Sequence, residues 1–314
     1  MTTPIVSVIM SVFNEQRYLS KSIESLLQQT FKDFEFIIVD DASTDASFGI
    51  MQGYASKDGR IILIKNPVNQ GLASSLNNAL SAVKGEFIAR MDADDTSVKN
   101  RLEVQLEFLG KNPGIALAGS SIELIDPDGN IIARSDAVDN PAILKKLIFY
   151  KNICPHPTWM FRKGILKDLK GYRSLPAAQD YDFLMRLYSA GYEISNINIP
   201  LLHYRVHERK ISFDGSLTQI KLSRYLRKLY RNGLILNNRF FEKGQATFAP
   251  PSKILQRIHS LSLRLFEKGR FLIKDNSPIS GVLLLCVSAM LSPYMAYFIY
   301  CGFRAKLIEK SAGN

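Results

Sequence analysis

The pattern that most restricts the fold is an alternation of short apolar runs and amphipathic stretches over residues 5–110. Residues 5–12, 35–40, 61–64 and 86–91 are rich in Val, Ile and Phe, which predicts buried strands. The stretches between them, such as residues 72–83 closed by Gly85, predict helices. Strands that are apolar on both faces and separated by helices indicate a doubly wound, mostly parallel sheet in an α/β fold. Ligands of such sheets bind at the carboxyl ends of the strands.

The middle of the chain predicts a mixed extension of this sheet. Two apolar runs, 115–125 and 131–134, flank a turn of sequence Asp-Pro-Asp-Gly and predict a hairpin. We expect a short helix over 141–150, a strand over 158–161 and a helix over 180–190. Strand signals fade beyond Gly215, so we expect one domain over residues 1–212 and a second, helical region over 213–314.

The loop after the first strand excludes two common nucleotide-binding classes. Residues 11–15 (SVFNE) contain no glycine, whereas a dinucleotide-binding turn needs G-x-G-x-x-G and a P-loop needs G-x-x-x-x-G-K-[ST]. A diphosphate can instead be held by a divalent metal that bridges it to carboxylates. We therefore looked for acidic side chains at the strand ends.

Two acidic clusters follow predicted strands of the sheet. Asp40 and Asp41 follow the second predicted strand, and Asp92, Asp94 and Asp95 follow the fourth. Three acids within four residues repel one another unless a cation or solvent relieves them. The alternative is that some of these acids only cap the helices that follow.

Four blocks of the sequence resemble the family 2 glycosyltransferases with the GT-A fold. They are VSVIMSVFNE at 6–15, VDDASTD at 39–45, NQGL at 69–72 with Asn77, and MDADD at 91–95. Their order and spacing match over about residues 4–212. The resemblance implies an inverting enzyme that moves a sugar from a nucleotide-sugar donor to an acceptor hydroxyl.

The same resemblance implies roles for individual residues. Asp94 is the closing acid of a D-x-D element that ligates a divalent ion, Mn or Mg, on the donor diphosphate, with Asp92 beside it toward the ribose and the metal. Asp41 accepts the N–H of a uracil-like base, which favours a UDP-sugar. The remaining donor-binding residues on this side are Ser11, Phe13, Glu15 and Asp40.

Inversion also needs a general base on the face of the sugar opposite the leaving diphosphate. Asp180 stands at the family's position for this base, although Gln179 replaces the usual Glu before it. The alternative role for Asp180 is an N-cap of the helix. We expect Asp182 to be a solvated or dipole-complementing acid in the first helical turn.

Two further segments resemble the family's acceptor side and its mobile loop. His156 and Trp159 are candidate acceptor-binding residues, with a core position as the alternative for this single Trp. Arg205 and His207, in a segment followed by Ser212, are placed to neutralise the departing diphosphate. A solvated basic loop is the alternative for that segment.

The charge of the chain is concentrated in its last third. Residues 201–314 carry 19 basic and 6 acidic side chains, a net +13 against +11 for the whole chain. Residues 253–271 predict a basic amphipathic helix, and residues 277–303 contain no charged side chain. Pro293 divides that apolar segment, and both of its flanks are basic. We expect a re-entrant or interfacial helical pair at the cytoplasmic face of the cell membrane; a kinked span and a buried hairpin are the alternatives.

These observations favour a metal-dependent inverting glycosyltransferase. The expected partners are a nucleotide-sugar donor, a lipid-linked or surface-polysaccharide acceptor and a membrane surface. The alternative function is a catalytically silent nucleotide-sugar-binding or scaffold protein on a membrane. Nucleic acid is not an expected partner, because the basic region lacks a helix-turn-helix pattern and interleaved aromatic residues.

Overall fold

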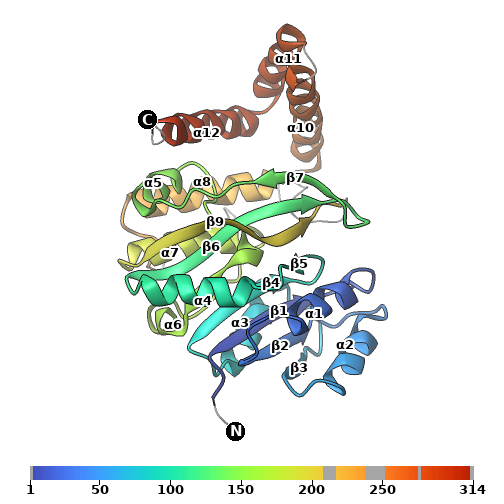
Figure 1. Cartoon of the computed structure of the whole chain (residues 1–314). Coiled ribbons are helices and arrows are strands. Elements are labelled where there is room, and N and C mark those ends of the chain that lie inside the picture. The colour runs from blue at the N-terminus through green and yellow to red at the C-terminus, as the bar shows by residue number, and fades with distance from the viewer. Residues whose placement is uncertain (1–2, 208–216, 238–251, 275–276, 312–314) are drawn as a thin grey trace. The chain divides into compact units, whose positions relative to one another are not determined.

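The computed structural model describes residues 3–207, 217–237, 252–274 and 277–311 (Figure 1). The chain forms two compact units. The first contains residues 1–145, 152–174 and 183–207, and the second contains residues 146–151, 175–182 and 208–314. The domain boundary expected at 212–213, and Ser212 itself, lie outside the described residues.

The first unit contains a nine-stranded mixed sheet in the order β3-β2-β1-β4-β8-β6-β9-β5, with β7 paired to β6. Strands β1 to β4 are parallel to one another, whereas β8 runs antiparallel to both β4 and β6. The expected α/β fold with a mostly parallel core is confirmed. The strands are β1 (Val6–Val12), β2 (Phe34–Asp40), β3 (Ile61–Lys65), β4 (Phe87–Asp92), β5 (Thr96–Ser97), β6 (Ile115–Ile125), β7 (Ile131–Ser135), β8 (Met160–Arg162) and β9 (Glu193–Arg205).

Helices cover this sheet as the alternation predicts. The main core cluster joins alternate residues of β1 and β2 to apolar residues of α1, α2 and α4. The helices up to residue 189 are α1 (Leu19–Leu27), α2 (Ser47–Ala55), α3 (Leu72–Ala82), α4 (Arg101–Lys111), α5 (Pro141–Leu147), α6 (Leu166–Leu169) and α7 (Gln179–Ser189). The strand expected over 158–161 begins only at Met160, because residues His156–Thr158 form a 3-10 turn around Pro157, which has no N–H for a strand ladder.

Strand register brings the two acidic clusters to one edge. Ser11 of β1 pairs with Asp92 of β4, and the next residue, Val12, pairs with Asp40 of β2. On the far side of the sheet, β5 pairs with β9 at His203, so the end of β9 lies beside the segment that follows β4. The carboxyl ends of β1, β2, β4 and β9 therefore converge.

The second unit is helical, with α8 (Leu217–Arg231), α10 (Lys253–Lys274), α11 (Pro278–Leu291) and α12 (Pro293–Lys310). The buried side chain of Arg227 in α8 links three other segments of this second unit. Its guanidinium donates to Tyr181 Oη at 2.7 Å, to Tyr150 O at 2.8 Å and to Tyr297 Oη of α12 at 3.2 Å. Among the described helices, none combines the length and the low charge that a membrane crossing requires.

Candidate active site

Three carboxylates meet at the end of β4. The oxygens of Asp92, Asp94 and Asp95 lie within 4.8 Å of one another, with Asp94 and Asp95 buried and Asp92 half-buried. A set of carboxylate oxygens at this spacing suits a hard divalent cation such as Mg²⁺ or Mn²⁺. The residues present therefore fit the metal that the sequence implied.

Two buried arginines fix the strand that carries this cluster. Arg90 Nη2 forms an ion pair with Asp92 Oδ1, and Arg90 Nε and Nη1 have no hydrogen-bond partner among the described residues. Burial is the largest single influence on the pKa of Arg90 and lowers it, but the charge and hydrogen bond of Asp92 together with the smaller effects of Tyr172 and Asp95 raise that pKa overall. Arg101 donates from Nη2 to Arg90 O at 2.7 Å and from Nε to Gln105 Oε1 at 3.0 Å. The charge of Arg90 and burial lower the pKa of Arg101 to about 9, with burial the larger cause.

Arg205, at the end of β9, is wholly buried and acts on the backbone around the cluster. Its N–H donates to Asp95 Oδ1 at 2.8 Å and its Nε to Asp94 O at 2.9 Å. Its Nη1 donates to the carbonyls of Asp126 and Pro127 in the β6–β7 turn, at 2.9 and 3.1 Å. In this conformation the guanidinium holds two loops together, and contact with a donor diphosphate stays a prediction.

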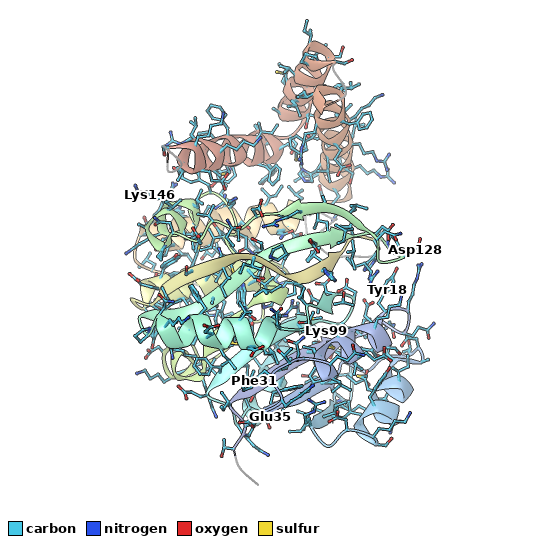
Figure 2. The ribbon with its side chains drawn as sticks, in the orientation of Figure 1. Tyr18, Phe31, Glu35, Lys99, Asp128 and Lys146 are labelled. Carbon is cyan, nitrogen blue, oxygen red and sulfur yellow. The ribbon has the colours of Figure 1, made fainter. Side chains whose placement is uncertain are left out.

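His207 reaches the cluster directly. A 3.0 Å hydrogen bond joins His207 Nε2 to Asp94 Oδ2, and both side chains are nearly buried. The ring of Tyr18 lies 5.4 Å from the His207 ring and 4.5 Å below the Arg205 guanidinium carbon. Figure 2 shows Tyr18 at the same edge as the β6–β7 turn that carries Asp128. The Tyr18 hydroxyl is buried and has no hydrogen-bond partner among the described residues.

The second acidic pair organises the loops beside β2. Asp41 accepts from the backbone N–H groups of Gln70 and Gly71, each at 2.8 Å, and from Asn66 Nδ2 at 2.8 Å. Asp40 Oδ1 accepts from the N–H of Ser43 at 3.1 Å, whereas Asp40 Oδ2 is buried with no partner among the described residues. Both acids are thus fixed at the sheet edge, and their contact with a base stays a prediction.

The loop after β1 is tied to the loop after β2. Asn14 and Ala42 both have a left-handed backbone, with φ of 56° and 60°, which is uncommon for residues other than glycine. Asn14 Oδ1 accepts from Thr44 N at 2.8 Å, and Glu15 N donates to Ser47 Oγ at 2.9 Å. Phe13 is exposed on this loop, and Ser11 and Glu15 are half-buried. A flat exposed ring beside two fixed loops is suited to contact a nucleoside.

The two candidate acceptor residues, His156 and Trp159, have different surroundings, although their rings lie 4.5 Å apart. Trp159 is fully buried, donates from Nε1 to Cys154 O at 3.1 Å and packs against Phe183. An indole without an exposed face cannot stack on a sugar, so Trp159 is a core residue and not an acceptor-binding one. His156 is half-buried and joins Tyr172 Oη through Nε2 at 2.8 Å. Burial, and secondarily the charge of Arg90, hold the pKa of His156 well below its usual value, so its ring is neutral.

Asp180 lies half-buried in the first turn of α7, where it also accepts from the N–H of Tyr181 at 2.8 Å. Its role as a base stays a prediction. Asp182 lies in the first turn of α7 as expected, where an acid complements the helix dipole. It is fully buried, so the alternative of a solvated acid is wrong.

Sequence reasoning missed Tyr18, Arg90 and Arg101. An arginine inside the otherwise apolar strand FIARM was the one available signal, because a charge is buried in a strand only when something nearby compensates it. Tyr18 and Arg101 gave no such signal, since tyrosine and arginine are ordinary residues at the start of a helix.

Comparison with known proteins assigns a family. The profile of Glycosyl transferase family 2 matches residues 7–170. An uncharacterized glycosyltransferase of Methanocaldococcus jannaschii is 39% identical over 224 residues, which are 70% of this chain and 76% of that protein. The O-antigen biosynthesis glycosyltransferase WbnJ of Escherichia coli is 32% identical over 74% of this chain and 92% of its own length. The Escherichia coli protein WfaP, described as a UDP-Glc:alpha-D-GlcNAc-diphosphoundecaprenol beta-1,3-glucosyltransferase, is 30% identical over 72% of this chain and 86% of its own length.

Solved structures share the fold at lower identity. Residues 1–349 of S. aureus TarS, in complex with UDP-GlcNAc, superpose with a TM-score of 0.60 at 21% identity, covering 98% of this chain and 91% of that one. The mannosyltransferase PcManGT of Pyrobaculum calidifontis, in complex with GDP-Man and Mn²⁺, superposes with a TM-score of 0.53 at 17% identity, covering 97% and 88%. At these identities the likeness concerns the fold alone.

Proposed function

The chain belongs to glycosyl transferase family 2, and from this premise we propose that it is a metal-dependent inverting glycosyltransferase that uses a UDP-sugar. The observation that carries the proposal is the meeting of Asp92, Asp94 and Asp95 at the carboxyl ends of the parallel strands, with His207 on Asp94. A catalytic role at that edge agrees with the general behaviour of doubly wound sheets.

On the donor side, Asp94 and Asp92 are the residues proposed to hold the metal. When bound, a divalent cation neutralises the donor diphosphate and its developing charge. The chain's own residues define where that charge sits. Arg90 fixes the Asp92 carboxylate, and the backbone N–H of Arg205 fixes that of Asp95. Phe13, Asp40 and Asp41 are proposed to contact the nucleoside. His207 is proposed to exchange its bond to Asp94 for one to the departing diphosphate.

On the acceptor side, Asp180 is proposed as the general base. It takes the proton of the acceptor hydroxyl as the hydroxyl oxygen bonds to the anomeric carbon. The bond from that carbon to the diphosphate oxygen breaks with its electron pair going to the leaving nucleoside diphosphate. Attack from the opposite face inverts the configuration. His156, neutral and partly exposed, is proposed to accept or donate a hydrogen bond to the acceptor.

The choice of substrates rests on the relatives. WfaP is described as using UDP-Glc and a GlcNAc-diphosphoundecaprenol acceptor, and WbnJ as an O-antigen enzyme. A related substrate pair is therefore proposed here, namely a UDP-sugar and a lipid-linked glycan in surface-polysaccharide assembly.

The test is a transfer assay with the full chain. A panel of UDP-sugars, with GDP-mannose as comparison, is incubated with Mn²⁺ and a synthetic GlcNAc-diphospho-lipid, and the product is identified by mass and anomeric configuration. Transfer from a UDP-sugar with inversion supports the proposal, whereas transfer with retention overturns it. The silent-protein alternative predicts donor binding without release of UDP under any of these conditions.

A further inference from the structure

The two helices α10 and α11 pack through polar and small residues (Figure 1). Ser262 Oγ donates to Ser288 O at 2.7 Å and Ser288 Oγ donates to Ser262 O at 2.8 Å, which closes a reciprocal pair between the helices. His259 Nδ1 lies 3.1 Å from Ser292 Oγ, and both side chains are buried. Hydrogen bonds therefore occupy this part of the interface between the helices, where a water-soluble pair usually has apolar side chains.

Glycines bring the two backbones into contact further along the pair. A Cβ added at Gly269 would lie 2.8 Å from Gly281 O, and one added at Gly281 would lie 2.6 Å from Gly269 O. Close backbone approach through small residues, with serine hydrogen bonds across the interface, is typical of helices that associate in an apolar solvent.

The apolar side chains of α11 point outward. Ile279 is 86% exposed, Met290 83% and Leu283 63%, and α11 contains no charged residue. The full exposed apolar set on this helix is Ile279, Val282, Leu283, Val287, Met290 and Leu291. Unlike the outer face of a soluble hairpin, the outer face of α11 is therefore apolar.

Charge on α10 indicates what covers this face. Arg257, Arg264, Lys268 and Arg270 are exposed, and Glu267 is the only acid of the helix. One hollow on α10 contains Arg257 and Arg264 together with Gln256, Ser260 and Leu261. Two copies of such a basic helix repel each other, whereas anionic lipid headgroups attract it and acyl chains accept the apolar side chains beside it.

We propose that α10–α11 is an interfacial membrane anchor, with the apolar face of α11 in the acyl boundary of an anionic bilayer and the α10 arginines on lipid phosphates. The 14 residues of α11 are about 21 Å long, against about 30 Å for a bilayer core, so the hairpin lies in the interface. The proposal places the protein on the cytoplasmic face of the cell membrane. It is independent of the transfer reaction, because lipid binding needs no nucleotide.

A native cysteine allows a direct test. Cys286 of α11 is exposed, whereas Cys154 and Cys301 are buried, so a bimane label on the full-length protein reports on this face. Vesicles of phosphatidylcholine with phosphatidylglycerol should shift the bimane emission to the blue and carry the protein upward in a flotation gradient. Vesicles of phosphatidylcholine alone should do both more weakly. An unshifted label together with protein left at the bottom of the gradient overturns the proposal.

Variants distinguish the two proposed contributions to membrane binding, the insertion of apolar side chains and the contact of arginines with lipid phosphates. Leu283→Asp should weaken partitioning at least about tenfold, because it places a charge in the inserted face. The matched control Ile132→Asp changes an equally exposed apolar residue, 57% exposed on β7, and should leave partitioning unchanged. Arg257→Gln and Arg264→Gln should each cost about fivefold on anionic vesicles at low salt and nothing on neutral ones. If light scattering without lipid instead shows a dimer that Leu283→Asp dissociates, and vesicles do not bind, a second copy covers the face and the proposal is wrong.

Discussion

The carboxyl edge of the sheet and the α10–α11 hairpin differ in where their charged side chains lie. At the sheet edge, charged groups are buried and each described acid is met by arginine, histidine or backbone N–H. In the hairpin, neutral hydroxyls and an imidazole are buried, while apolar side chains and arginines face outward. Buried charge is costly and is retained where chemistry needs it, whereas outward apolar surface is retained where something apolar covers it. Substitutions in the two regions test this contrast.

The largest effect is expected for the proposed base. Asp180→Asn should lower turnover by roughly 100-fold or more while leaving donor affinity unchanged, because it removes a proton acceptor and keeps the shape. Initial rates and calorimetric UDP-sugar binding measure the two quantities. Leu283→Asp in the hairpin is the control and should keep the full rate with a soluble acceptor. Near wild-type turnover in Asp180→Asn would move the base elsewhere in the chain.

We expect Arg205 to contribute mainly to the stability of the fold. Arg205→Met leaves the buried carbonyl of Asp94 and the partly buried carbonyls of Asp126 and Pro127 without their donor, and should lower the free energy of unfolding by about 2 kcal/mol. Urea unfolding measures it. Arg205→Lys should rescue little, since one ammonium cannot reach carbonyls on two loops. Stability unchanged in the Met variant, with weaker donor binding, would instead support contact with the diphosphate.

Substitution of two glycines tests whether the backbones of α10 and α11 pack closely. Gly281→Ala should cost about 1–3 kcal/mol of unfolding free energy despite the better helix propensity of alanine, because its Cβ meets the Gly269 backbone. Gly302→Ala in α12 has nothing within 4 Å and should be neutral or stabilising by up to about 1 kcal/mol. Stabilisation by both substitutions would contradict the contact between α10 and α11.

The smallest effect concerns pH. His156 has a depressed pKa in the folded chain, so below about pH 6.5 the unfolded chain takes up a proton that the folded chain refuses. Stability should therefore fall as pH drops, by at most about 1.4 kcal/mol per pH unit from this group. His156→Gln keeps a donor to Tyr172 and removes the titration, so its stability curve should be flatter by about 1 kcal/mol between pH 6.5 and 5.5. Superimposable curves for the two proteins would contradict a neutral His156 ring.

Local patterns predicted the sheet because strand periodicity is a property of neighbouring residues. The expected strand over 35–40 is Phe34–Asp40, and the expected hairpin is Ile115–Ile125 with Ile131–Ser135. The convergence of Asp40 and Asp92 followed from topology alone, since parallel strands end at one edge. That part of the site could be predicted from the sequence.

The remaining features depend on partners far away in the chain. Arg205 bonds to carbonyls near residue 126, and carbonyls carry no sequence signal. Trp159 and Asp182 are buried by tertiary packing that no local pattern specifies. In the hairpin, the sequence shows the apolar residues of α11. Serine is also common on exposed surfaces, so the sequence does not show that Ser262 and Ser288 face inward. Only the structure shows that the apolar side chains face outward.

The central claim is that Asp94 holds the metal that binds the donor. Calorimetric titration of UDP into the wild-type chain and into Asp94→Asn, each with Mn²⁺ and with chelator, tests it without any acceptor. Asp136→Asn, which changes an exposed acid paired with Arg134, is the matched control. We predict that Mn²⁺ strengthens UDP binding about tenfold or more in the wild type and the control, and not in Asp94→Asn. Equal binding in all three proteins, with and without chelator, would contradict the account.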